Sequence, residues 1–278
     1  MTSLDARKKL EGMAGLPTIP RAARHIFELV KNRQTPMKRL EWAIGSDPAL
    51  ATRMLRFANS ETYGFPNRIN SLSHAMILLG GNMIRGLILS AGVMEKDLTE
   101  AEALWRHSLA VSWVAGELAA RAGLKDLERV SLVGLLHDLG KLALLVLFPG
   151  KYETVARQLR KSKLDCLAAE KAVFGIDHGE VAGQLCHSWS LPSSICAPII
   201  YHHCPDRAQD DFAVAAVIHV ADVLVKAVGV GHAHDIYVPP PLNEAWLELG
   251  ISENDLKEVV INTANQLRDL ELLDPFSG

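Results

Sequence analysis

The chain has 278 residues, enough for one large domain or two smaller ones with a sizeable buried core. Hydrophobic residues make up 49% and charged residues 22%, which is the composition of an ordinary globular protein. The net charge of −3 excludes a general electrostatic attraction to nucleic acid or to an anionic membrane.

The N-terminal third is expected to consist of helices separated by proline and glycine. Thr35–Pro36 and Asp47–Pro48 each place a capping side chain before a proline, which predicts two helix starts. Further helices are predicted over residues 22–30, 71–79 and 82–96. Gly80–Gly81 separates the last two. No stretch alternates convincingly between apolar and polar residues as strands do, so we expect an all-α fold.

Positive charge is concentrated in part of this region. Residues 21–56 contain eight Lys or Arg against three acidic residues. The pattern fits solvated helix faces, and it also fits a docking surface for an acidic partner.

A second helical block begins near Thr99. We therefore place a subdomain boundary near residue 98, which divides the chain into an N-terminal part (1–98) and a C-terminal part (99–278). Apolar residues recur at steps of three and four from Leu104 to Leu118, as on one face of a long helix. Further helices are predicted over residues 132–136, 151–162, 164–173, 178–188, 192–203, 212–228 and 254–270.

The sequence carries no sign of export or of membrane insertion. The four cysteines form no C-x-x-C pair and no secretory signal opens the chain, so we expect a reduced, cytoplasmic protein. Apolar runs such as Leu142–Phe148 are too short to span a bilayer.

A dense set of nitrogen and oxygen metal ligands lies in the second block. Most of them fall in helical patterns that face an apolar interior, where an unpaired carboxylate or a group of imidazoles is costly to bury. A bound cation would supply the missing partner, so the set predicts a metal centre. Its members are His107, His137, Asp138, His178, His202, His203 and Asp222.

Each residue also has a simpler interpretation when taken singly. His107 fits a core position, and Asp138 fits the cap of the next helix. His202 and His203 diverge by about 100° on a helix, so both serve one site only at a frayed helix end or between two metals. Lys141 lies one turn after His137 and could reach a bound anion. His219 is a candidate hydrogen-bond donor to the ligands.

The ligand types favour transition metals. Imidazole and carboxylate with little thiolate suit Fe, Mn, Zn, Ni or Co, and so many ligands fit two ions bridged by Asp138. Two ions about 3.5–4 Å apart would activate a shared water and clamp a phosphoester, with Lys141 neutralising phosphate charge. A metal-filled site can instead stabilise the fold or act as a sensor.

Four of these residues resemble the H…HD…D motif of the HD superfamily of metal-dependent phosphohydrolases. The matching positions are His107, His137–Asp138 and Asp222. The resemblance implies an all-α core around a metal site.

The remaining histidines resemble the extended ligand set of the HD-GYP branch, whose members hydrolyse cyclic dinucleotides. His178 and His202–His203 carry this likeness. The chain departs from the branch at residues 204–206, where Cys-Pro-Asp follows instead of Gly-Tyr-Pro. Ala103 stands where some members hold a glutamate that binds a third metal, and the spacing from Asp138 to His178 is long.

The N-terminal half resembles the HDOD family more closely. The similar stretches are residues 16–20 (LPTIP), 46–50 (SDPAL), 53–60 (RMLRFANS) and 77–80 (ILLG), and the resemblance runs from about residue 16 to 225. It implies an all-helical output module of bacterial signal transduction with no agreed enzymatic activity. Many HDOD proteins have lost the metal ligands, whereas this chain has the whole set.

Three functions follow as hypotheses. The first is a signalling output module that acts through a protein partner and uses its metal centre as a structural or sensory element. The second is an active phosphohydrolase on a nucleotide or cyclic dinucleotide, with Asp138 and Lys141 as catalytic residues. The third, nucleic-acid binding through residues 21–56, is the weakest, because the region has no aromatic platform or reading motif.

Overall fold

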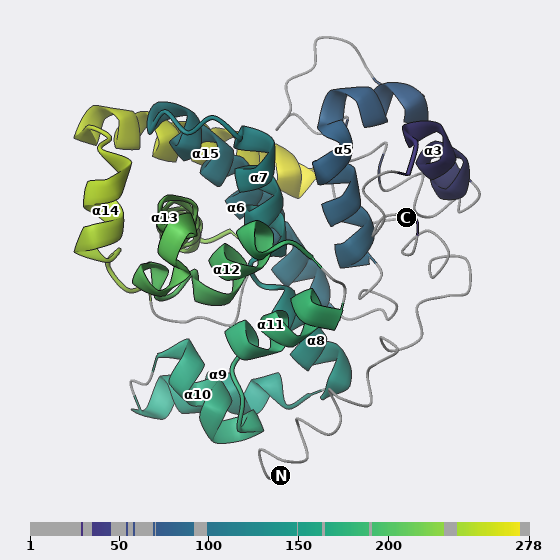
Figure 1. Ribbon diagram of the computed structural model, residues 1–278. Coiled ribbons are helices and arrows are strands. Elements are labelled where there is room, and N and C mark those ends of the chain that lie inside the picture. Colours follow the sequence, from purple (N-terminus) through teal and green to yellow (C-terminus); the bar gives the residue numbers. More distant parts are fainter. Residues whose placement is uncertain are drawn as a thin grey trace.

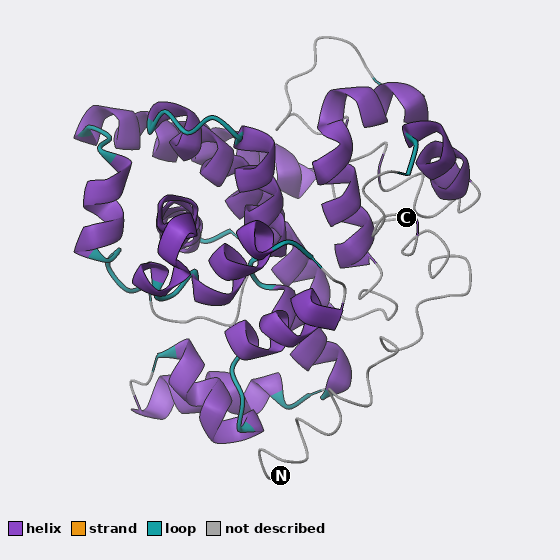
Figure 2. Ribbon diagram, in the orientation of Figure 1, coloured by secondary structure: helices purple, strands orange, loops and turns teal. Residues whose placement is uncertain are grey.

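The computed structural model describes residues 29, 35–45, 54, 58, 69, 71–91, 99–148, 150–162, 165–188, 191–230 and 238–272. Every regular element within these ranges is a helix, and the ranges contain no strand (Figure 2). The predicted all-α fold class is therefore confirmed. Most of the helices predicted over 22–30 and after Pro48 lie outside the described residues.

Figure 1 shows the arrangement of the described helices. In chain order they are α3 (Met37–Gly45), α5 (Leu72–Ala91), α6 (Thr99–Arg121), α7 (Leu127–Leu136), α8 (Leu139–Leu147), α9 (Tyr152–Ser162), α10 (Cys166–Phe174), α11 (His178–Ser188), α12 (Ser193–Tyr201), the 3-10 helix η3 (Pro205–Asp211), α13 (Phe212–Ala227), α14 (Asn243–Leu249) and α15 (Glu253–Leu272). Helices α8, η3 and α14 are additions to the predicted elements.

Helix α13 forms the centre of the C-terminal part. It contacts α6, α7, α12 and α14, and Figure 1 shows it nearly end-on with α6, α12 and α14 around it. Every side chain from Val214 to Val223 is buried, because the helix is apolar almost all round. Its three polar side chains, His219, Asp222 and Lys226, therefore stand out within the core.

Helices α8 and α11 cross at very short range at Gly140. A Cβ atom at this position would lie 1.8 Å from the backbone oxygen of His178, so only glycine allows the observed approach. The crossing brings the segment that follows His137–Asp138 against the start of α11.

Helix α5 is kinked at Gly80. The φ of 76° and ψ of 157° at Gly80 are not helical, so α5 consists of two helical segments that meet at a kink. This agrees with the two helices that the sequence predicts on either side of Gly80–Gly81. Helix α5 contacts both α3 and α7, so the kinked helix connects the N-terminal elements to the C-terminal part.

The C-terminal helix covers part of the core. Helix α15 contacts α6, and Val259 and Thr263 are buried. Arg121 Nη2 lies 3.8 Å from Glu258 Oε2 at this contact. None of the described helices is both long and apolar enough to cross a bilayer.

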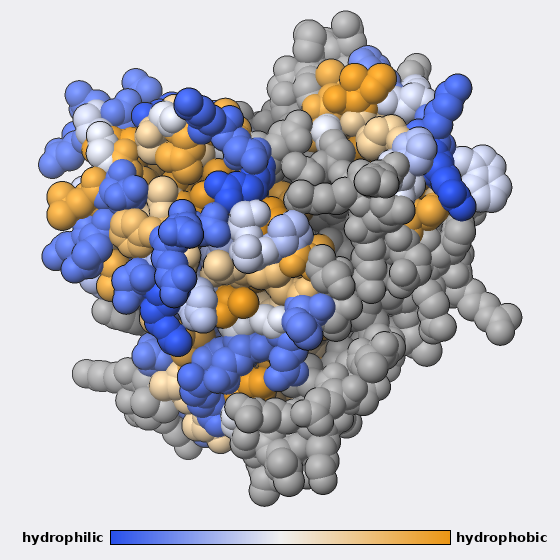
Figure 3. Space-filling view, viewed as in Figure 1, coloured by the Kyte–Doolittle hydropathy of each residue, from blue (hydrophilic) through white to orange (hydrophobic). Residues whose placement is uncertain are grey.

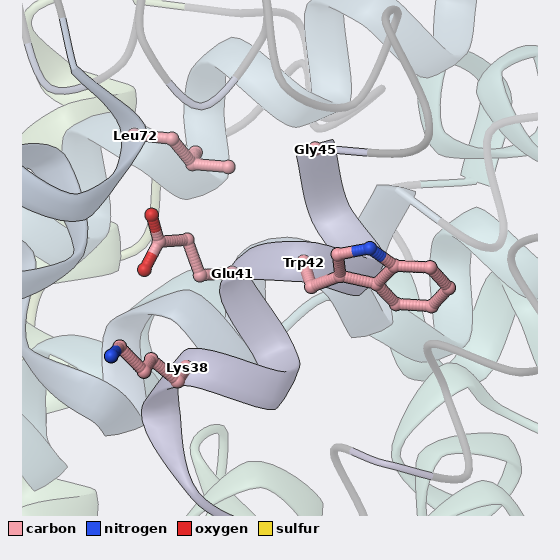
Figure 4. Close-up of a pocket in the computed structure, with 5 residues that line it drawn as sticks. All are labelled: Lys38, Glu41, Trp42, Gly45 and Leu72. Atoms are coloured by element: carbon pink, nitrogen blue, oxygen red, sulfur yellow. The ribbon is translucent and has the colours of Figure 1, made fainter.

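The N-terminal elements α3 and α5 stand to one side of the other helices (Figure 1). A groove between them is lined by Lys38, Glu41, Trp42, Gly45 and Leu72 (Figure 4). The Trp42 side chain is exposed, and apolar surface gathers over α5 (Figure 3). The subdomain boundary near residue 98 stays a prediction.

Candidate metal centre

The His137–Asp138 pair forms the turn between two buried helices. Helix α7 ends at Leu136 and α8 begins at Leu139. Asp138 occupies the N-cap position of α8, yet its side chain makes no capping hydrogen bond. The Asp138 side chain therefore does not cap helix α8. Its carboxylate lies among histidines instead.

The first cluster consists of His107 from α6, the His137–Asp138 turn and Asp222 from α13. His107 Nε2 lies 2.9 Å from Asp222 Oδ1 and 3.8 Å from Asp138 Oδ2. His137 Nε2 lies 3.4 Å from Asp138 Oδ2 and 3.7 Å from Asp222 Oδ1. Four candidate ligands from three segments therefore point toward one position.

The second cluster consists of His178, His202 and His203. His178 is the first residue of α11, and the other two form the turn directly after α12. His178 Nε2 lies 3.4 Å from His202 Nε2, and the His203 ring centroid lies 4.1 Å from that of His202 and 5.0 Å from that of His178. Because helix α12 has ended at Tyr201, the adjacent histidines can face one site together.

Asp138 joins the two clusters through its two carboxylate oxygens. Oδ2 faces the first cluster, whereas Oδ1 lies 3.6 Å from His178 Nε2 and 3.8 Å from His202 Nε2. The structure thus brings all seven predicted ligands together. Six of them are only 0–2% exposed: His107, His137, Asp138, His178, His202 and Asp222.

Three polar atoms of this centre lack hydrogen-bond partners among the described residues. They are His137 Nε2, Asp138 Oδ1 and His203 Nε2, and all three are buried. Such atoms are rare in folded proteins because each carries a desolvation cost. A cation bound at each cluster would satisfy these atoms, so the donor set fits metal ions.

Backbone carbonyls hold two of the imidazoles in the orientation that a metal ligand needs. His137 Nδ1 donates to Gly134 O at 2.7 Å, and His202 Nδ1 donates to Ile199 O at 2.8 Å. Because Nδ1 carries the proton in both bonds, Nε2 is the ring nitrogen that points into the centre and is available to a metal ion that displaces any proton on it.

The carboxylates are stabilised in their charged form. Burial alone would raise the pKa of Asp138, but His137 and Lys141 hold it well below its usual range. Burial also opposes charge on Asp222, and Lys226 and His107 likewise hold its pKa well below the usual range.

The histidine pKa values differ within the centre, and burial lowers the pKa of His107 below its usual value. Burial alone would lower the pKa of His137, but the neighbouring Asp138 and Asp222 outweigh it and raise the pKa to about 9. Burial lowers the pKa of His202 and His203 well below the usual range. His202 and His203 therefore offer neutral rings, the form that binds metal.

Each buried carboxylate has a lysine partner. Lys141 Nζ donates to Asp138 Oδ2 at 3.0 Å and is fully buried. Lys226 Nζ donates to Asp222 Oδ2 at 2.7 Å. Lys141 was predicted from the sequence as a site residue but Lys226 was not, although the position of Lys226 one helical turn after Asp222 is a usable signal.

His219 supports the ligand turn. Its Nδ1 donates to the backbone oxygen of His202 at 2.9 Å, and its Nε2 accepts from Leu242 N at 3.1 Å. This agrees with the prediction of a hydrogen-bond donor to the ligands. Glu170, which was not predicted from the sequence, contacts the centre and accepts from His178 Nδ1 at 2.7 Å. The hydroxyl of Tyr152 in turn donates to Glu170.

Comparison with known proteins establishes the family. The model of the HDOD domain matches residues 16–205, more than half of the chain. The chain belongs to the HDOD domain family, and the predicted resemblance is confirmed. The similar stretches 16–20 and 46–50 lie outside the described residues.

Two curated relatives match only part of their own length. An uncharacterised protein from Treponema pallidum is 23% identical over 201 residues, which cover 71% of this chain and 39% of the relative. Ribonuclease Y from Thermus thermophilus is 28% identical over 142 residues, which cover 51% of this chain and 20% of the relative.

Solved structures share the fold over nearly the whole chain. An HDOD domain protein of unknown function from Geobacter sulfurreducens is 25% identical with a TM-score of 0.74, over 99% of this chain and 98% of that one. A Marinobacter aquaeolei protein, provisionally described as a signal transduction protein, is 23% identical with a TM-score of 0.73, over 97% of this chain and 61% of that one.

Proposed function

We propose that this protein is a signalling output module whose two clusters hold two divalent transition-metal ions in a structural or sensory centre. His107, His137, Asp138 and Asp222 would hold one ion. His178, His202 and His203, with the second oxygen of Asp138, would hold the other. Fe, Mn, Zn, Ni and Co suit this mixture of imidazole and carboxylate.

One observation carries this proposal: the ligands converge in a place that is almost closed to solvent. Six of the seven side chains are 0–2% exposed, and three of their polar atoms lack hydrogen bonds among the described residues. The convergence of the seven ligand side chains supports the binding of metal ions. Burial supports a structural or sensory role, because a catalytic ion needs an open position that a substrate can reach.

Membership of the HDOD family supports the signalling role. The resemblance implies an output module of bacterial signal transduction, and the Marinobacter aquaeolei protein is provisionally described as a signal transduction protein. Action through a protein partner is part of the proposal. A cytoplasmic location is part of the same proposal.

A phosphohydrolase acting on a nucleotide or cyclic dinucleotide is the second candidate. It is supported by the ammonium of Lys141 at the carboxylate shared by the two clusters, and by the similarity to Ribonuclease Y. Bound ions would supply an activated water and electrostatic stabilisation of the phosphate. Asp138 would bridge them, and Lys141 would neutralise a phosphate oxygen.

Metal content and turnover of the purified chain test the two candidates. We expect elemental analysis to find two transition-metal ions per chain, and no hydrolysis of bis(p-nitrophenyl) phosphate or cyclic dinucleotides. Asp138→Ala should lose both ions because both clusters share this carboxylate. The exposed Asp210→Ala serves as the matched control.

The outcomes separate the alternatives. A wild-type chain without transition metal would rule out the metal centre. Turnover that disappears in Asp138→Ala would replace the first candidate by the second. Turnover that survives in Asp138→Ala would exclude the metal mechanism for hydrolysis.

A further inference from the structure

Glu170 is a fully buried acid that lies next to the second cluster. It belongs to α10, and its carboxylate reaches the first residue of α11, His178. Oε2 accepts from the backbone N of His178 at 2.8 Å and from Nδ1 of the same residue at 2.7 Å. Oε1 accepts from the hydroxyl of Tyr152 and from Cys166 Sγ at 3.7 Å.

The contacts around Glu170 fix the state of the His178 ring. The carboxylate oxygens of Glu170 accept hydrogen bonds, and each of their four contacts described above offers a donor. His178 Nδ1 must then carry the proton, which leaves the lone pair on Nε2. This Nε2 atom faces His202 Nε2 and Asp138 Oδ1.

The two clusters do not depend on Glu170 to the same extent. In the first cluster, His137 is held by a carbonyl of its own helix, Gly134 O. In the second cluster, His178 is held by a side chain from a different helix. Loss of Glu170 therefore removes an orientation constraint from the second cluster alone.

We propose that Glu170 is a positioning residue that sets the tautomer and orientation of His178 and so controls retention of the ion in the second cluster. This inference rests on the proposed two-ion centre. Hydrogen-bond partners of metal-bound histidines typically change metal affinity by roughly 10- to 100-fold when they are replaced.

Another arrangement uses the same atoms. Cys166, Glu170 and His178 lie close enough together to be ligands of an ion themselves. Such an ion would need the lone pair on His178 Nδ1, which the Glu170 hydrogen bond assigns to a proton. The geometry therefore favours positioning over ligation, and a stoichiometry measurement distinguishes them.

The test compares the metal stoichiometry of the wild-type chain with that of two variants, using elemental analysis and Co²⁺ titration followed by absorption. Glu170→Met keeps the side-chain length but removes the acceptors, and we expect it to retain one ion where the wild type retains two. Glu170→Gln can keep its carbonyl oxygen toward His178, so we expect two ions with the second bound about 10- to 100-fold more weakly. The exposed Glu248→Met should match the wild type.

Several results would overturn the inference. If Glu170→Met holds two ions tightly, or if both variants bind the two ions equally more weakly, Glu170 does not position His178. Loss of a third ion would make Glu170 a ligand. If Glu170→Met does not fold, unchanged affinity for the second ion in Glu170→Gln overturns it. Fewer than two ions in the wild type would overturn the proposed function itself.

Discussion

The two buried carboxylates of the centre each pair with an ammonium group on the same helix or the helix that follows. Asp138 pairs with Lys141 and Asp222 with Lys226. A lysine in this place offsets the charge of a carboxylate when no cation is bound. The energetic importance of each lysine therefore depends on whether the centre holds metal.

Lys226→Met tests this dependence. In chelator-treated protein the variant leaves Asp222 with less compensation, and we expect unfolding free energy to fall by about 3–5 kcal/mol, as when one member of a buried ion pair is removed. In metal-loaded protein the ion supplies the charge, so the loss should be clearly smaller. Urea unfolding with and without chelator measures both values, and equal losses would contradict the prediction.

Residue types alone predicted the histidines and aspartates, because these side chains are unusual on apolar helix faces. Glu170 was not predicted because a glutamate in a helical stretch normally indicates a solvent-exposed helix face. A signal was nonetheless present: Glu170 lies four residues after Cys166 and four before Phe174, on the face that is buried in the structure. Its contact with His178 depends on tertiary packing, which the sequence pattern does not encode.

At the scale of elements, the site depends on how closely its helices approach each other. The crossing of α8 and α11 leaves no room for a side chain at Gly140, whose Cβ would overlap the backbone oxygen of His178. Because the obstacle is backbone, a larger residue can be accommodated only if one helix shifts.

Gly140→Ala should therefore destabilise the protein by about 1–3 kcal/mol, the usual cost of overpacking, and should also weaken binding of the ion next to His178. Thermal unfolding and metal titration measure the two effects. Gly45→Ala is the matched control, since its new Cβ would meet only Leu72 Cδ2 at 3.7 Å. Wild-type stability and wild-type metal affinity in Gly140→Ala would disprove the argument.

Helix positions were predicted well for α9 and α11, whose predicted ranges of 151–162 and 178–188 agree with the observed helices to within one residue. The short helix α14 was missed because seven residues give too little periodicity to recognise. Helix α12 ends two residues earlier than predicted, at Tyr201, and this difference determines how His202 and His203 can face the same site. Helix ends depend on local tertiary contacts, so they are predicted less accurately from the sequence than the middle of a helix.

At the scale of the whole molecule, the ligands connect segments that are distant in the chain. His107 and Asp222 lie 115 residues apart in sequence, yet their side chains are in contact. An ion held by both binds only the folded chain, and its binding free energy therefore adds to stability.

Removal of metal should consequently lower the melting temperature. A single ion at 100 times its Kd adds about 2.7 kcal/mol, and for domains of this order of size each kcal/mol shifts Tm by roughly 2–4 °C, so chelation should lower Tm by about 5–10 °C. Differential scanning calorimetry with and without chelator measures the change. Asp138→Ala, which lacks the shared carboxylate, should show no response to chelator. A metal-containing wild type with the same Tm after stripping would refute the coupling.

The near-complete burial of the ligands has a kinetic consequence. An ion can leave only when packed helices separate locally, and such openings are infrequent in the most protected parts of a protein. Exchange with free metal in the surroundings should accordingly be slow. The metal found in protein isolated from cells would then record which ion was abundant while the chain was folding, and later changes of buffer would scarcely alter it.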